Sequence, residues 1–266
     1  MENLEKLATE VLKLTSVVGE YMRNEIDKVE STQIEEKEMN SLVSYVDKTS
    51  EEMLVKVLSQ LVPEAGFITE EKTIKTEEKQ YMWIVDPLDG TTNYLFGIPH
   101  YSTSIALQVN GEVVLGVVSD NAKQEYFHAI KGKGAYKNGV KITLESEQTL
   151  LLANSIFVTG FPYSNDYNSA AFFEVINHWL MNARGVRRLG SAALDLCYVA
   201  CGRINCYYES FLNIWDIAAG DLIVKEAKGI SSDFYGVDNQ LKSGQILACD
   251  ARIYEEVLTV VKNKLT

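Results

Sequence analysis

The stretch that decides the fold is Asp86-Pro87-Leu88-Asp89-Gly90-Thr91-Thr92-Asn93, which directly follows the short apolar run Trp83-Ile84-Val85. Pro87 fixes the backbone where this predicted strand ends, and Gly90 relieves the steric limits of the turn. Two carboxylates three residues apart can then converge on one point, and Asp89 is suited to cap a helix that follows it. An Asx-turn without a ligand is the alternative for an isolated Asp-x-x-Asp. The full string instead favours a site for cations and phosphate, with the amides of Gly90 and Thr91 facing the anion.

Hydrophobic periodicity predicts helices and strands on the N-terminal side and directly after this stretch. Apolar residues at steps of three and four predict helices over residues 4–26 and 47–61, and the polar, mostly acidic residues 30–40 between them predict an exposed loop. Asn110-Gly111 and Asn138-Gly139 each lie between strand-like runs, which is typical of tight turns. We therefore expect a meandering antiparallel sheet.

The C-terminal half alternates strands with helices. We expect strands near residues 151–158, 204–208 and 245–249, and helices near 168–182, 191–201, 216–228 and 251–264. This change of pattern predicts two sub-domains of one layered body, residues 1–145 and 146–266.

Composition excludes some classes of partner. The 37 acidic and 25 basic residues give a formal net charge of −12, which repels nucleic acid and anionic membranes. We see no basic region followed by an apolar stretch at the start and no apolar run long enough to span a bilayer, so we expect a cytoplasmic protein. The four cysteines form no C-x-x-C pair and are expected to be reduced thiols. The three histidines join no motif, and we interpret them as structural.

Four motifs together resemble the inositol monophosphatase family, the lithium-sensitive, Mg²⁺-dependent phosphatases. Asp86–Thr92 is similar to the first signature of that family, and Ile214-Trp215-Asp216-Ile217-Ala218-Ala219-Gly220 is similar to the second. Thr69-Glu70-Glu71 and Leu42-Val43-Ser44-Tyr45-Val46-Asp47 are further matches, with Ser44 where the family usually has Thr. The matches occur in the family's order. The resemblance implies a layered α+β or α/β fold, the α-β-α-β-α sandwich of the sugar phosphatase type.

The resemblance also implies in-line hydrolysis of a small phosphate monoester by a water that two or three Mg²⁺ ions activate. It assigns these metal ligands: Glu70, Asp86, the carbonyl of Leu88, Asp89 and Asp216. It gives catalytic roles to Glu70, Thr91 and Asp47, which orient the water and accept its proton. The amides of Gly90 and Thr91 would bind the phosphate. The residues that it places on the substrate are Asp89, Gly190, Ser191, Ala192, Glu209 and Asp216. Residues 1–145 would thus supply most metal ligands, and residues 146–266 would supply Asp216 and the substrate pocket.

Elementary electrostatics supports the need for cations. At 4 Å, each pair of carboxylates costs about 1 kcal/mol in a water-like dielectric and several times more when shielded from water. Four of them in one place are tolerable only when cations or protons neutralise them.

Several substrates remain compatible with the sequence. Inositol monophosphate is the leading one, and NADP(H) 2′-phosphatase or fructose-1,6-bisphosphatase activity, alone or as a dual specificity, is the alternative. Thr92 stands where relatives specialised for 3′-phosphoadenosine 5′-phosphate carry Lys, and Asn213 replaces a histidine of animal relatives. A non-catalytic metal-binding protein is a more distant alternative.

Two features outside the motifs leave their role open. Arg184, Arg187 and Arg188 form either a solvated basic edge or a contact with a second phosphate or a dimer partner. A homodimer is the habit of the family that the sequence resembles.

Overall fold

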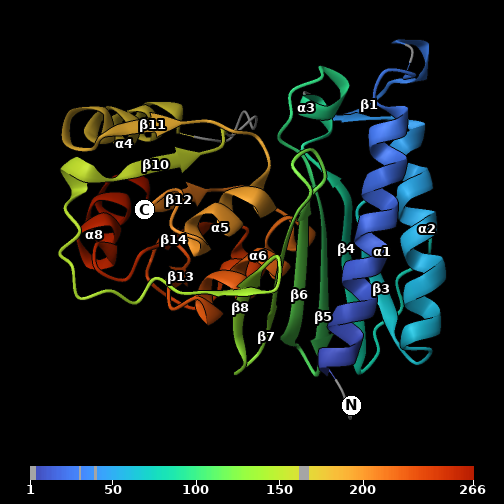
Figure 1. The fold of residues 1–266 in the computed structure, drawn as a ribbon. Coiled ribbons are helices and arrows are strands. Elements are labelled where there is room, and N and C mark those ends of the chain that lie inside the picture. Colours follow the sequence, from blue (N-terminus) through green and yellow to red (C-terminus); the bar gives the residue numbers. More distant parts are fainter. Residues whose placement is uncertain (1–3, 30, 39–40, 162–167) are drawn as a thin grey trace.

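The computed structural model of the chain describes residues 4–29, 31–38, 41–161 and 168–266. Five layers follow one another across the molecule: a helix pair, a seven-stranded sheet, a second helix pair, a five-stranded sheet and a third helix pair (Figure 1). This order confirms the layered α-β-α-β-α fold that the resemblance implies.

The large sheet is the expected meander. Its strands lie side by side in chain order: β3 (Gly66–Thr69), β4 (Tyr81–Asp89), β5 (Ser102–Val109), β6 (Glu112–Asp120), β7 (Glu125–Ile130), β8 (Gly134–Lys137) and β9 (Val140–Ile142). The pair β3–β4 is parallel, and every later pair is antiparallel. Asn110 and Asn138 adopt positive φ angles of 51° and 50° at the two predicted Asn-Gly turns, the conformation that such hairpin turns require.

Strand β4 explains why the large sheet carries helices on both faces. Successive side chains of a strand point to opposite faces. Trp83 and Val85 pack in the layer of α1 (Leu4–Glu25) and α2 (Tyr45–Leu61), whereas Ile84 packs in the layer of α5 (Ala192–Ala200) and α6 (Ile214–Glu226). An apolar run without polar alternation is therefore what a doubly covered strand needs.

Helix α6 approaches the large sheet closely. A Cβ atom on Gly116 of β6 would lie 2.7 Å from the carbonyl oxygen of Ala219, so only glycine leaves room for the helix backbone at this point. The small residues Ala218, Ala219 and Gly220 let α6 sit between the two sheets, with its N-terminus close to the end of β4.

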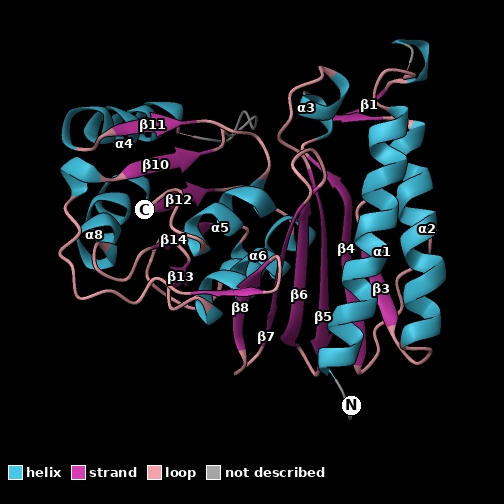
Figure 2. Cartoon of the chain, in the orientation of Figure 1, coloured by secondary structure: helices cyan, strands magenta, loops and turns pink. Residues whose placement is uncertain are grey.

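The small sheet has the order β11 (Gly185–Arg187), β10 (Ile156–Thr159), β12 (Cys206–Glu209), β14 (Ile246–Cys249) and β13 (Ile230–Ser232). Figure 2 shows α4 (Ser169–Asn182) and α8 (Tyr254–Leu265) beyond it, and Phe157, Trp179, Leu247 and Val257 form the apolar core of this side. The short helices are α3 (Thr91–Leu95) and α7 (Gln240–Ser243), with 3-10 turns η1 (Ser31–Gln33) and η2 (Leu152–Asn154).

The prediction of a plain loop over residues 30–40 is wrong for the residues that the structure describes. Turn η1 precedes β1 (Glu35–Glu38), which pairs antiparallel with β2 (Ser41–Val43). Residues 30, 39 and 40 lie outside the described residues. A strand of four charged residues shows no hydrophobic periodicity, so the pattern could not reveal it.

No helix in the described part of the chain is both long enough and apolar enough to cross a lipid bilayer.

An ion-pair cluster ties the large sheet to the central helix layer. Glu125 on β7 accepts hydrogen bonds from both terminal nitrogens of Arg203, which follows α5, and Lys137 Nζ lies 2.6 Å from Glu125 Oε1. The Arg203 bonds, assisted by Lys137 and opposed by partial burial, lower the pKa of Glu125 to about 2.

We expect Glu125→Gln to lower the free energy of unfolding by about 2 kcal/mol at pH 7. A carboxyl whose pKa is depressed in the folded state stabilises above its unfolded pKa of 4.5, and that stability is lost as pH falls toward 2. Urea unfolding of both proteins between pH 7 and pH 2 would measure the difference, which should narrow below about pH 4.5. Glu112→Gln, which removes an exposed carboxylate paired with Lys131, is the matched control and should change little. A difference in free energy of unfolding between wild type and Glu125→Gln that is the same at every pH would contradict the stabilising role of the ionised Glu125 carboxylate.

Candidate active site

Four acidic side chains meet where β3, β4 and α6 end or begin. Asp86 and Asp89 lie among the last four residues of β4, and Glu70 follows β3 directly. Because β3 and β4 are parallel neighbours, their carboxyl ends lie at the same edge of the sheet. Asp216 comes from the first turn of α6, which starts beside that edge.

The charges of these side chains act on one another. Asp86 is buried, and Glu70, Asp89 and Asp216 are partly buried. Burial raises the pKa of Asp86 well above its usual range, and the negative charges of Glu70, Asp89 and Asp216 raise it further. The pKa of Asp216 is raised well above its usual value by burial, then by Asp89 and Glu70. The four carboxylates therefore form one electrostatic unit.

The donor set fits a hard divalent cation. The negative charge of Glu70 raises the pKa of Asp86, so the two carboxylates repel one another when both are ionised. Among the described residues, no three His, Cys, Asp or Glu side chains have the spacing of a finished metal site. Carboxylate oxygens are the ligands that Mg²⁺ prefers, and a bound cation would relieve their repulsion.

Asp89 does not cap α3, contrary to the sequence-based expectation. Gly90 occupies that position, and Asp89 Oδ2 instead accepts hydrogen bonds from Ser191 Oγ at 2.6 Å and from the Ala193 amide at 2.8 Å. Burial raises the pKa of Asp89, while these two bonds oppose the rise. The carboxylate thus joins the end of β4 to the beginning of α5, which no local pattern could reveal.

Asp216 is held by its own helix. It stands at the third position of α6 rather than at the helix start that the sequence predicts, and its Oδ2 accepts a 2.6 Å bond from the amide of Asn213. This reciprocal cap leaves one carboxylate oxygen for another partner.

Thr91 and Asp47 are in direct contact. Thr91 Oγ1 lies 2.9 Å from Asp47 Oδ1 and 2.9 Å from the carbonyl oxygen of Leu88, so one hydroxyl proton is shared between two acceptors. Asp47 Oδ2 accepts from both the amide and the hydroxyl of Ser44 at 2.8 Å. Burial raises the pKa of Asp47, and its bonds from Ser44 and Thr91 oppose this. Ser44 thus fulfils the orienting role with the hydroxyl that the usual Thr would offer.

Gly90 makes the turn between β4 and α3 possible. Its φ of 92° is left-handed, and a Cβ atom here would lie 3.0 Å from the His100 carbonyl oxygen and 3.1 Å from that of Gly190. Any side chain would strain the backbone and push these segments apart.

The predicted substrate residues lie on two segments of the C-terminal half. Gly190, Ser191 and Ala192 form the entry to α5, and Ser191 caps that helix by accepting from Leu194. Glu209 ends β12, accepts a 2.6 Å bond from Tyr207 Oη, and has its pKa raised by burial to about 7. The Glu209 pKa is also raised by Asp89 and lowered by Arg188, which places both charges near it.

Two residues that support the site were missed by the sequence reasoning. Glu51 on α2 is buried and accepts from Thr69 Oγ1 and from the amides of Glu71 and Thr73, so it holds the loop around Glu70. Asp47 and Glu51 are four residues apart on the apolar face of one helix, and that pattern was the available signal. Asn93 is the second, and its amide contacts segments remote in the sequence.

The remaining polar features keep structural contacts. His100 Nε2 lies 3.3 Å from Asp195 Oδ1. Burial lowers the pKa of His100 to about 4, so His100 is neutral at pH 7, and burial raises the pKa of Asp195. Arg184 donates to Asn154 and Arg187 to a backbone carbonyl.

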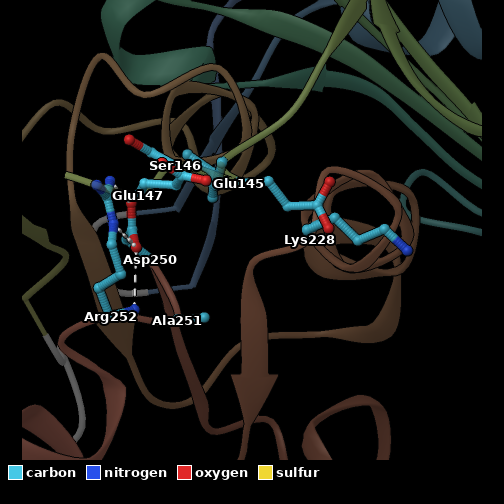
Figure 3. A pocket seen from close by; sticks show the side chains of 8 residues that line it. Glu145, Ser146, Glu147, Lys228, Asp250, Ala251 and Arg252 are labelled. Carbon is cyan, nitrogen blue, oxygen red and sulfur yellow. Dashed lines mark hydrogen bonds and ion pairs between the residues drawn. The ribbon is translucent and has the colours of Figure 1, made fainter.

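Three surface cavities lie away from the carboxylates. One of about 560 Å³ is lined by residues 144–147, Lys228 and residues 250–252, and Figure 3 shows Arg252 bonded to Asp250 within it. Others of about 570 and 330 Å³ flank α6 and the C-terminal end of α8. None of the three is lined by Glu70, Asp86, Asp89 or Asp216, so the group of carboxylates lies outside these cavities.

Comparison with known proteins now decides the family. The sequence model described as the inositol monophosphatase family matches residues 3–265. The chain belongs to the inositol monophosphatase family. It is accordingly a phosphatase.

Two relatives and one solved structure are similar to this member of the inositol monophosphatase family over most of its length. "Nus factor SuhB" of Haemophilus influenzae is 42% identical over 237 residues, which is 89% of this chain and 87% of that protein. "Inositol-1-monophosphatase" of Mesorhizobium japonicum is 36% identical over 249 residues, 93% of either protein. The structure of an IMPase from Thermotoga maritima has a TM-score of 0.88 and 32% identity, covering 98% of each chain.

We expect Asp86→Asn to stabilise the metal-free protein and to abolish stabilisation by Mg²⁺. Removing one of the mutually repelling groups should raise Tm by roughly 2–4 °C in chelator. Wild type should gain about 2–3 kcal/mol in Mg²⁺ at 100 times its Kd, and the variant should gain almost none. Thermal unfolding with chelator and with MgCl₂ measures both effects.

Asp233→Asn is the control, because that buried carboxylate accepts only from backbone amides near Tyr235 and Val237 among the bonds seen here. It should keep the Mg²⁺ shift. A full Mg²⁺ shift in Asp86→Asn would exclude Asp86 as a ligand.

Proposed function

We propose that this phosphatase hydrolyses a small phosphate monoester in a Mg²⁺-dependent reaction, with inositol monophosphate as the first substrate. The observation that carries the proposal is the group of mutually repelling carboxylates beside the Thr91–Asp47 contact, namely Glu70, Asp86, Asp89 and Asp216. The site would lie between sub-domains 1–145 and 146–266.

The carboxylates fit the cation in both number and chemistry. We assign these groups as ligands: Glu70, Asp86, the carbonyl of Leu88, Asp89 and Asp216. Bound Mg²⁺ would supply Lewis-acid polarisation and would neutralise the negative charge that otherwise repels a phosphate.

Thr91 and Asp47 would handle the proton of the attacking water. Thr91 Oγ1 already lies 2.9 Å from Asp47 Oδ1, so the hydroxyl can donate to Asp47 while it accepts from a water. The burial that raises the Asp47 pKa makes this carboxylate a better base. Glu70 is a second acceptor within the same group. The amides of Gly90 and Thr91 would bind the phosphate oxygens at the turn.

The alcohol part of the substrate would face the C-terminal half. Glu209, with a pKa of about 7, can accept a hydrogen bond from a substrate hydroxyl or donate one to it. Ser191 and Ala193 hold the Asp89 carboxylate by hydrogen bonds, so Asp89 would face the same alcohol part of the substrate. Several neighbouring hydroxyl groups, as in inositol, would use these polar groups better than a simple alcohol.

NADP(H) 2′-phosphatase and fructose-1,6-bisphosphatase activity remain the alternatives. A structural neighbour of 23% identity is described as a dual specific IMPase/NADP phosphatase bound with D-inositol-1-phosphate. At this identity it supports the fold alone, and the dual specificity is a property described for that protein.

The test is phosphate release from inositol 1-phosphate, NADP⁺, fructose 1,6-bisphosphate and 3′-phosphoadenosine 5′-phosphate, with Mg²⁺ and with chelator. We expect Mg²⁺-dependent release that is greatest for inositol 1-phosphate, and a loss of roughly 10³-fold in kcat for Asp89→Asn. Asp233→Asn is the matched control and should retain activity. No release from any substrate by folded, Mg²⁺-loaded wild type would overturn the proposal.

A second candidate function comes from the relatives named Nus factor SuhB, two of which are 41% and 42% identical to this chain. The favouring observation is an outward apolar face on α4, where Phe173, Leu180 and Met181 are 58%, 57% and 77% exposed. Phe173 and Leu180 are two turns apart on one face, as a surface for a protein partner requires.

Complementation of an Escherichia coli strain that lacks its own SuhB separates the two roles. We expect Asp89→Asn to restore the strain and Leu180→Glu to fail while keeping phosphatase activity. The reverse pattern would remove this second candidate. Loss of dimers together with both functions in Leu180→Glu would mark the face as a dimer contact instead.

A further inference from the structure

The side chain of Asn93, the last residue of the stretch 86–93, bonds to the backbone of two other segments, residue 100 and residues 189–190. It is buried, with 6% of its surface exposed. Its Nδ2 donates to the carbonyl oxygens of His100 and Leu189 at 2.8 Å each, and a longer contact of 3.4 Å reaches that of Gly190. Two N–H groups are thus fully used by acceptors from two different parts of the chain.

The segments that Asn93 joins both lie against the Gly90 turn. The carbonyl oxygens of His100 and Gly190 are the atoms that a Cβ on Gly90 would meet at 3.0 and 3.1 Å. A buried backbone carbonyl needs a hydrogen-bond donor. The side-chain amide of Asn93, one turn further along α3 than Gly90, supplies that donor to His100 and to Leu189.

Each of the joined segments carries a different part of the proposed site. Gly90 and Thr91 precede Asn93 and belong to the phosphate side. Ser191 and Ala193 follow Gly190 and donate to Asp89 on the substrate side. The distance between the two sides therefore depends on how firmly residues 189–190 are held against α3.

We propose that Asn93 is a positioning residue, whose amide fixes segment 189–193 against the Gly90 turn and so sets the separation of the phosphate side from the alcohol side. This inference rests on the proposed function for its catalytic consequence. Asn93 acts through backbone carbonyls and contributes no charge.

The neutrality of Asn93 distinguishes it from the other contacts across the same boundary. The bonds from Ser191 and Ala193 end on Asp89, whose charge distribution changes when it binds a cation. The contact of His100 with Asp195 involves two titratable groups at 3.3 Å. The Asn93 bonds keep the same strength whether or not the carboxylates are neutralised. We therefore expect the Asn93 bonds to persist when a cation binds to the carboxylates.

Hydrogen exchange tests the positioning role without any substrate. We expect amides of residues 189–194 to exchange roughly 10-fold faster in Asn93→Leu than in wild type, because a buried side chain that donates to two carbonyls is replaced by an isosteric apolar one. Asn93→Ser is the second variant, since its smaller side chain avoids a steric clash if the leucine does not fold.

Asn121→Leu is the matched control. Asn121 is also buried, with 2% of its surface exposed, and donates to Thr103 Oγ1 of β5 at 2.9 Å; among the bonds of the described residues it makes none to residues 189–194. Asn121→Leu should lower the free energy of unfolding by a similar amount without specifically accelerating amide hydrogen exchange at residues 189–194. Equal acceleration in both variants, or no acceleration in either Asn93 variant, would overturn the positioning role.

Kinetics with two substrates then tests the catalytic consequence. Inositol 1-phosphate reaches both sides of the site, whereas phenyl phosphate carries no hydroxyl groups for the alcohol side. We expect the Asn93 variants to lose roughly 30- to 100-fold in kcat/KM for inositol 1-phosphate and about 3-fold for phenyl phosphate. Asn121→Leu should affect both alike.

The two proposals fail in different ways. Wild type that releases no phosphate from these two substrates or from the rest of the panel would refute the proposed function, and the exchange data would still decide the role of Asn93. Normal wild-type activity with equal losses for both substrates in the Asn93 variants would refute the separation role alone.

Discussion

The repulsion among Glu70, Asp86, Asp89 and Asp216 is the constraint on which the rest of the structure depends. Burial and mutual charge raise the pKa values of these groups, so an isolated chain segment would let them separate. The fold prevents this because three different parts of the chain hold three of the carboxylates. The α6 cap holds Asp216, the α5 entry holds Asp89, and the amide of Leu88 donates to Asp86 at 3.0 Å. The layers around the site therefore form a frame that holds the four carboxylates together against their mutual repulsion.

This frame explains the arrangement of the layers around the site. A parallel pair at one edge of an otherwise antiparallel sheet brings Glu70 beside Asp86, because only parallel neighbours have their carboxyl ends on the same side. Helix α6 can reach the same edge because small residues on it face Gly116 of the sheet. Helix α2, in the outer layer on the opposite face of the sheet, contributes through its buried residues Asp47 and Glu51. Three layers therefore converge on one group of charges.

Sequence alone predicted the parts of the site that are encoded locally. The eight-residue string places Asp86 and Asp89 at a strand end followed by a left-handed glycine, and the structure has that geometry. The hairpins at Asn110 and Asn138 were predictable for the same reason. Asp216 and Glu70 came from family resemblance, since nothing in their own segments distinguishes a ligand from a cap or a surface charge. The bonds of Asp89 to α5 were not predictable, because they join residues 102 and 104 positions apart. The wrong helix cap at Asp89 was the direct result, since a cap is the local use of a carboxylate that propensity rules supply.

The missed residues Glu51 and Asn93 show what such long-range bonds have in common. Both are buried polar side chains that bond to backbone groups of other segments rather than to a ligand. An unpaired buried amide or carbonyl costs free energy comparable to a lost hydrogen bond, so irregular loops around a charged site need such donors and acceptors. A site built from loop ends must therefore be surrounded by buried polar residues that no motif of ligands includes. Glu51, four positions after Asp47 on an apolar helix face, and Asn93, which directly follows the first signature, are the two places where this chain meets that requirement.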